Sequence, residues 1–153
     1  MVTGSEKSEL NSELICKQRG DLARIGAPYD IYSLNDIDRV DPNEYKLFVF
    51  LDAFYLTDSQ RDYINHTLKG GGRSLLLIGA CDYISNGYVS TEQLSAMAEM
   101  EIGILETEET TVKAADTTYG YAAPKAPTLY VRDADAEILG TYEVEWMGEK
   151  IDL

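Results

Sequence analysis

The residues best suited to chemistry in this sequence are one cysteine, Cys81, and two aspartates, Asp52 and Asp82. Each lies just after a short apolar run, 46–51 for the first aspartate and 74–78 for the other two residues. Such runs are typical of strands buried in a parallel sheet, and ligands of α/β folds bind where these strands end. We therefore predict a small-ligand site, for a sugar for instance, at Asp52, Cys81 and Asp82. The competing interpretation is that the aspartates cap helices.

A catalytic role for Cys81 would require a lowered thiol pKa and a base within hydrogen-bonding distance. His66 is the only histidine. It lies about 200° around its predicted helix from the buried Ile64, so it is expected to face solvent. The run Gly-Ala-Cys-Asp-Tyr also has no small residue two positions after the cysteine. We interpret Cys81 as a structural or incidental thiol, and a Cys-dependent hydrolase or amidotransferase is the alternative.

Metal and phosphate chemistry are not predicted. Cys16, Cys81 and a single histidine cannot assemble a Cys/His zinc site, so neither a metal nor a cofactor is expected. The glycine run 70–72 follows a predicted helix and precedes a strand, whereas phosphate loops follow a strand and precede a helix. The run is therefore predicted to end a helix. The acidic run at 106–109 is interpreted as a solvated surface.

Composition excludes several classes of partner. The chain has 153 residues, the size of one domain spanning 1–153, and its 13 basic and 27 acidic residues give a net charge of −14. This charge repels phosphate backbones and anionic membranes, so neither nucleic acid nor a membrane is expected as a partner. No apolar run approaches the ~20 residues of a membrane span, and the first 14 residues contain no signal-peptide core. These features favour a cytoplasmic location.

Hydrophobic periodicity and capping residues predict the elements that position these residues. Thr57 is a predicted N-cap, Ser90 and Gln93 have the spacing of a capping box, and Gly26 is a helix stop. Helices and strands alternate over the first two thirds of the chain, which is typical of a parallel sheet with crossover helices. Helices are predicted over 8–26, 57–69 and 90–100; strands over 28–34, 46–51, 74–78, 107–113, 128–132 and 137–146; and a loop over 116–127.

Three passages resemble a known family. The passages 53–64 and 70–77 read Ala-Phe-Tyr-Leu-Thr-Asp and Gly-Gly-Gly-Arg-Ser-Leu, 21–31 contains Ile-Gly-Ala-Pro-Tyr-Asp, and 133–142 reads Asp-Ala-Asp-Ala-Glu-Ile-Leu-Gly-Thr-Tyr. In this order they resemble the glutamine-amidotransferase-like domain of family 42 glycoside hydrolases, the β-galactosidase trimerisation domain. The resemblance implies an α/β, flavodoxin-like three-layer sandwich with a mostly parallel sheet and a C-terminal antiparallel hairpin.

The resemblance also implies a function. It suggests a non-catalytic structural or oligomerisation domain of a carbohydrate-processing, β-galactosidase-like protein, in which the catalytic carboxylates lie on a separate barrel. The family's domain opens with a buried strand that residues 1–8 do not resemble. We expect a fragment or short version of a larger protein, with the missing strand replaced by a rearranged strand or by a second copy. The side chains expected to bury against a second copy are Tyr83, Tyr88, Tyr119, Tyr121, Trp146 and Met147.

Overall fold

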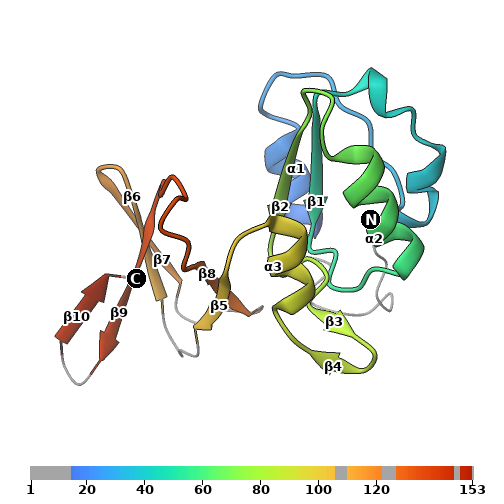
Figure 1. Cartoon of the computed structure of the whole chain (residues 1–153). Coiled ribbons are helices and arrows are strands. Elements are labelled where there is room, and N and C mark those ends of the chain that lie inside the picture. Colours follow the sequence, from blue (N-terminus) through green and yellow to red (C-terminus); the bar gives the residue numbers. More distant parts are fainter. Residues whose placement is uncertain (1–14, 106–109, 122–126, 147–148, 153) are drawn as a thin grey trace.

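The computed structural model describes residues 15–105, 110–121, 127–146 and 149–152. Its first body contains one parallel strand pair with helices packed around it (Figure 1). The elements of this body are α1 (Gln18–Leu22), the 3₁₀ helices η2 (Leu34–Arg39) and η3 (Pro42–Glu44), β1 (Leu47–Leu51), α2 (Asp58–Tyr63), the π-helical η4 (Ile64–Leu68), β2 (Ser74–Ile78), the hairpin β3 (Ile84–Ser85) and β4 (Tyr88–Val89), and α3 (Glu92–Ala98).

The remaining strands are antiparallel. β5 (Ile102–Leu105) pairs with β8 (Thr128–Val131), and a four-stranded sheet has the order β10-β9-β6-β7. The strands of that sheet are β6 (Thr110–Ala114), β7 (Thr117–Tyr121), β9 (Thr141–Trp146) and β10 (Glu149–Asp152). β5 and β8 lie between the first body and this sheet (Figure 1).

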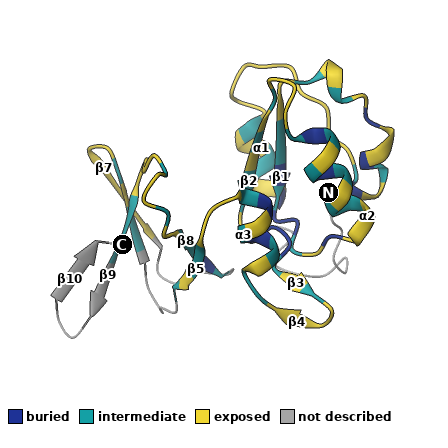
Figure 2. Ribbon diagram, viewed as in Figure 1, coloured by how far each residue is buried: buried dark blue, intermediate teal, exposed yellow. Residues whose placement is uncertain are grey.

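The hydrophobic core lies on one face of the parallel pair, against η2, α2, η4 and α3. Phe50, Leu56, Ile64, Leu68 and Met97 are among its buried members. In Figure 2 most of the buried residues lie in the first body. Burial of such side chains stabilises a fold by roughly 1.5–3 kcal/mol each. In the four-stranded sheet, none of the residues with a described side chain is buried. The core therefore holds the first body, where the predicted site lies.

The expected flavodoxin-like sandwich with a mostly parallel sheet is wrong. Within the described residues, parallel pairing joins only β1 and β2, and every other pair is antiparallel. β5 does not extend the parallel sheet, because it pairs with β8 instead. The predicted strand 28–34 forms no ladder. The C-terminal hairpin predicted at 133–142 is also wrong, because β8 pairs with β5, and β9 pairs with β6 and β10. A sandwich needs one wide sheet, and these strands instead form four small sheets.

The predicted loop 116–127 is also wrong at its start, because residues 117–121 form β7. β6 and β7 are joined by the two-residue turn Ala115-Asp116, in which the alanine has a positive φ of 50°. Tight two-residue hairpin turns require positive φ, and closing so short a loop costs little entropy. The Thr- and Tyr-rich segments on either side therefore pair locally.

Local helix signals were predicted more successfully. Thr57 caps α2 with a complete capping box, in which Thr57 Oγ1 accepts from Gln60 N–H (3.3 Å) and Gln60 Oε1 accepts from Thr57 N–H (2.9 Å). Helix α3 is present, and Ser90 Oγ accepts from the N–H of Glu92 (3.1 Å) at its start. The assigned N-cap is Thr91, which makes no side-chain hydrogen bond, so the complete capping box predicted at Ser90 and Gln93 is not formed. The expected first helix is described only from Ile15. Residues 1–8 lie outside the described part.

Candidate functional site

The structure brings the three predicted site residues together at the carboxyl ends of β1 and β2. Asp52 follows β1 directly, and Cys81 and Asp82 follow β2 after a short turn. Asp82 N–H donates to the carbonyl of Ala53 (2.8 Å), which ties the two strand ends to each other. All three residues are buried, with exposed fractions of 3 % for Asp52 and 0 % for the other two. The cluster is thus closed to solvent.

Asp52 has a strained backbone conformation, and its side chain fits only because the residue facing it is Gly79. It has a positive φ of 46°, and its carboxylate lies over Gly79, where an added Cβ would come 2.0 Å from Oδ1. The side chain of Gln18 donates to Asp52 Oδ2 at 3.4 Å and so links α1 to the end of β1. Burial raises the pKa of Asp52 to about 6. This carboxyl therefore changes charge close to neutral pH.

The raised pKa of Asp52 predicts a pH-dependent stability. The unfolded chain releases this proton near its ordinary pKa of 3.8 and the folded chain near 6, so the folded state binds the proton more tightly. The stabilisation is complete below pH 4 and is lost as the pH rises through 6. Relative to Asp52→Asn, the wild-type free energy of unfolding should fall by up to about 3 kcal/mol between pH 4 and 7. Urea denaturation of both proteins across this range measures the difference, and parallel curves would contradict the prediction.

Asp82 is held by an arginine that the sequence did not identify as part of the site. Arg61 of α2 donates from Nε to Asp82 Oδ2 (2.6 Å) and from Nη2 to Asp82 Oδ1 (3.0 Å), a bidentate pair. Arg61 Nη1 also donates to the exposed Asp58 (2.7 Å). The hydrogen bonds to Asp82, followed by those to Asp58, raise the pKa of Arg61 above its ordinary value. Asp82 therefore anchors α2 to the strand end.

Cys81 lacks the features of a nucleophile. Burial, followed by the negative charges of Asp82 and Asp52, raises the pKa of its thiol to about 12. His66 is exposed, as predicted, and its Nδ1 lies 2.9 Å from the carbonyl of Asp62 one turn earlier. The thiol is therefore protonated at neutral pH. Within the described residues, no three or more His, Cys, Asp and Glu side chains form a potential metal site.

Thiol labelling tests this environment directly. Cys16 is exposed and Cys81 is fully buried, so iodoacetamide should modify one thiol per native chain at pH 8. In a Cys16→Ser variant the native protein should remain unlabelled for hours, and it should react with one equivalent in 6 M guanidinium chloride. Rapid labelling of the native variant below pH 7 would show an ionised, accessible thiol and would contradict the assignment.

A hollow of the first body lies elsewhere, along β1. We call it the β1 groove: a groove of about 440 Å³ lined by residues of α1, by the segment 27–34 and by residues 44–51. A second hollow, of about 450 Å³, lies between β2, α3 and the β5–β8 pair. Asp52, Cys81 and Asp82 line neither of the two. The predicted site residues thus belong to the buried interior, and the open surface belongs to others.

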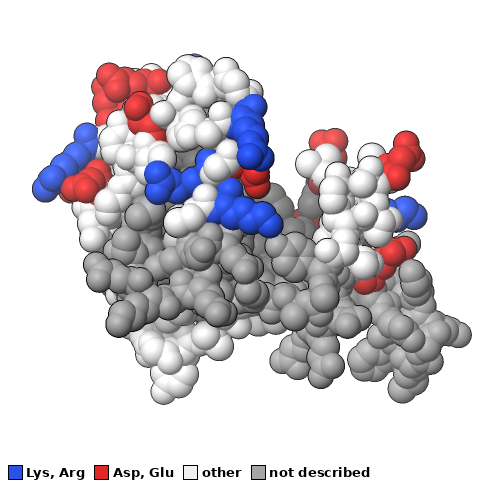
Figure 3. All heavy atoms as spheres, turned by 180° about the vertical axis from the view of Figure 1, so that it is seen from behind, with Lys and Arg blue, Asp and Glu red and all other residues white. Residues whose placement is uncertain are grey.

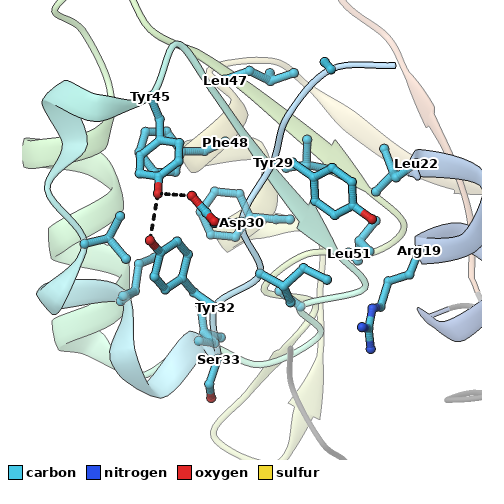
Figure 4. Close-up of a pocket in the computed structure, with 18 of the residues that line it drawn as sticks. Arg19, Leu22, Tyr29, Asp30, Tyr32, Ser33, Tyr45, Leu47, Phe48 and Leu51 are labelled. Carbon is cyan, nitrogen blue, oxygen red and sulfur yellow. Dashed lines mark hydrogen bonds between the residues drawn. The ribbon is translucent and has the colours of Figure 1, made fainter. Parts of the chain in front are cut away.

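The walls of the β1 groove are apolar and unusually exposed. Five large hydrophobic side chains that line it are 44–61 % exposed: Ile25, Tyr29, Ile31, Tyr32 and Leu47. One side carries a short polar chain, in which Tyr45 donates to Asp30 Oδ2 (2.6 Å) and meets Tyr32 hydroxyl to hydroxyl (2.7 Å) (Figure 4). Asp30 and Tyr32 raise the pKa of Tyr45 above its ordinary value. The sequence pattern predicts a paired strand over 28–34, so this surface is not evident from the sequence.

The aromatic residues expected at an interface lie in different places. Tyr88 and Tyr119 are 78 % and 57 % exposed, and Tyr83 is partly buried. The side chains of Tyr121 and Trp146 and the whole of Met147 lie outside the part that the structure describes. The acidic run 106–109 does too. None of the helices in the described ranges is long and apolar enough to span a bilayer.

Comparison of the chain with protein-family models, curated proteins and solved structures finds no significant match.

Proposed function

We propose that this chain is a non-catalytic structural module that holds copies of itself together through the β1 groove. The single observation that supports this most directly is the clustering of five exposed large hydrophobic side chains in one groove. Contiguous apolar patches that are rimmed by polar residues are typical of sites of association. The resemblance to the β-galactosidase trimerisation domain adds the proposed context, a carbohydrate-processing protein.

The buried strand-end cluster supports the non-catalytic part of the proposal. A nucleophile must reach its substrate, but Cys81 is inaccessible and its pKa lies far above neutral pH. A sugar site at Asp52, Cys81 and Asp82 would have to open the core and separate Asp82 from Arg61. The hydrolase and the strand-end ligand site are therefore less favoured than association.

Light scattering on the purified chain at micromolar concentration tests the association. We expect an assembly larger than the 17.0 kDa monomer. Leu47→Asp places a charge in the groove at a half-exposed position and should shift the assembly to monomers, because an unpaired charge is costly to bury. The matched control is Ile138→Asp, at a 71 % exposed apolar position outside the groove, which should not change the size. A wild-type protein that remains a monomer would refute the proposal.

A further inference from the structure

Gln18 and Asp52 form a side-chain contact that the proposed function does not use. Gln18 Nε2 donates to Asp52 Oδ2 at 3.4 Å and joins α1 to the end of β1. Within the described residues, Oε1 of the same amide is buried and has no hydrogen-bond partner. A buried acceptor without a partner costs free energy, so a donor at this oxygen would stabilise the contact. We call this pair of side chains the Asp52–Gln18 contact.

A proton on Asp52 would supply the missing donor. An ionised carboxylate only accepts hydrogen bonds, whereas a protonated carboxyl also has an O–H that donates. The amide of Gln18 can bind a neutral carboxyl through its oxygen and its nitrogen, with at most a turn about its last side-chain bond. Asp52 is 3 % exposed, and this burial raises its pKa to about 6. Hydrogen bonding and burial thus favour the same neutral form.

The charged groups around this carboxyl do not change that balance. Cys81, on the turn after β2, stays neutral because the pKa of its thiol is about 12. Asp82 on the same turn is paired with Arg61 of α2. From α1, the uncharged Gln18 makes the contact, and the next residue, Arg19, lines the β1 groove. Asp52 is therefore the group in this cluster whose charge changes near pH 6.

α1 is the neighbouring element that costs the least free energy to move. No residue from 16 to 33 is buried, and this range includes the whole of α1. The other neighbours, Ala53, Gly79 and Cys81, belong to the ends of β1 and β2, beside the core. Segments with few buried contacts open locally at a lower free energy than the whole fold. Displacement of α1 would therefore hydrate a charged Asp52 without opening the core.

We propose that the Asp52–Gln18 contact is a proton-dependent switch, in which the neutral carboxyl holds the Gln18 amide and keeps α1 docked. Loss of the proton to solvent leaves a buried charge and releases α1 from the end of β1. Ile15, Arg19 and Leu22, in α1 and the turn before it, line the β1 groove. Release of α1 therefore opens one wall of that groove.

Amide hydrogen exchange measures the docking of α1. The N–H of Ala23 donates to the carbonyl of Arg19 at 3.1 Å, and so short a helix is not stable once it is undocked. The protection of this N–H, corrected for the intrinsic pH dependence of exchange, should fall roughly tenfold from pH 5 to pH 7. It should level off at higher pH, because the folded pKa of Asp52 is about 6.

The urea dependence of exchange shows whether α1 opens by itself. A local opening exposes little surface, so exchange at Ala23 should respond weakly to low concentrations of urea. Exchange of the amides in the β1–β2 ladder should respond steeply, because these amides require global unfolding. Equal slopes would show that α1 leaves only when the whole fold is lost, and would overturn the switch.

Two variants separate the closed and open states. Asp52→Asn tolerates the positive φ of 46°, and its amide donates and accepts without titrating, so the protection of Ala23 should stay high from pH 5 to pH 8. Gln18→Met keeps the length of the side chain but has neither donor nor acceptor. It should lower the protection of Ala23 at pH 5 about tenfold, the effect of one lost hydrogen bond. Unchanged protection in Gln18→Met would contradict the proposal.

Arg19→Gln is the control for the neighbouring positive charge. It removes the charge next to Gln18 and leaves both members of the Asp52–Gln18 contact in place, so the pH dependence of protection should persist. A pH dependence that disappears in Arg19→Gln but persists in Gln18→Met would assign the effect to the arginine and overturn the switch.

The effect of the switch on association rests on the proposed function. If copies associate through the β1 groove, their dissociation constant should be lower at pH 5 than at pH 7.5. Acid also reduces the repulsion between copies that each carry −14, although acidic and basic side chains are interspersed on the face in Figure 3. Asp52→Asn shares every other titratable group with the wild type. It should therefore associate more tightly than the wild type at pH 7.5.

The outcomes separate the switch from the proposed function. A monomer in which the protection of Ala23 follows pH, and no longer does so in Asp52→Asn, would support the switch and overturn the association. An assembly in which the protection of Ala23 is independent of pH would overturn the switch and leave the association standing.

Discussion

Replacing Arg61 by methionine is expected to destabilise the fold by about 3–5 kcal/mol, the cost of leaving a buried charge without its partner. Asp82 is fully buried, and Arg61 provides both of its side-chain hydrogen bonds, at 2.6 and 3.0 Å. Methionine retains the length of the arginine stem but none of its donors. Urea denaturation at pH 7 measures the loss, which should appear as a lower midpoint at similar slope.

Two control variants isolate this effect. The side chain of Asp58 is 99 % exposed, so its ion pair with Arg61 contributes little. Asp58→Asn should therefore lower the free energy of unfolding by less than about 1 kcal/mol. Replacing the pair together, Arg61→Met with Asp82→Leu, should recover part of the stability, because no charge is then buried alone. A single Arg61→Met variant as stable as Asp58→Asn would show that Asp82 does not need its partner.

The second large effect is expected for Gly79→Ala, which should cost about 2–4 kcal/mol. Two causes act together at this position. Gly79 has a φ of +77°, and an added Cβ would lie 2.0 Å from Asp52 Oδ1, so the carboxylate would have to move within the core. Thermal or chemical denaturation measures the loss. The result also tests whether the strand ends are held by this contact.

Gly87→Ala is the matched control for backbone strain alone. Gly87 has a similar φ of +80°, but a Cβ there would have no atom within 4 Å. This variant should lose only the roughly 1–2 kcal/mol of a left-handed alanine. In an Asp52→Ala background, Gly79→Ala should approach the cost of Gly87→Ala, because the oxygen that clashes is gone. Equal losses for the two single glycine variants would show that the Asp52 contact carries no energy.

Both predictions give a structural role to the cluster of Asp52, Cys81 and Asp82 at the ends of β1 and β2. Arg61 and Asp82 fasten α2 to the strand ends, and Gly79 and Asp52 fit β1 against β2. In many α/β folds this edge binds the ligand. In this chain the same edge is closed, and the open surface lies beside β1. The residues with the most reactive chemistry in the sequence are thus part of the framework that supports the groove.

Several elements can be predicted from the sequence because short-range interactions determine them. The N-cap at Thr57, the strands over 47–51 and 74–78, and the glycines that end η4 follow from interactions within a few residues. The exposure of His66 follows from helix periodicity. The proximity of Asp52, Cys81 and Asp82 was also correctly anticipated, because parallel strands end at a common edge.

Tertiary structure alone decided the rest, because pairing depends on which partner is available. Residues 28–33 have a strand-like pattern yet form no ladder, and β5 pairs with β8, more than twenty residues away, instead of with β2. The contacts of Arg61 with Asp82 and of Asp52 with Gly79 also join residues far apart in the chain. A periodic sequence specifies which face of a strand is apolar, but the free energy of a ladder belongs to two segments at once. The sequence therefore determined many of the individual elements, and the competition among partners decided which strands pair.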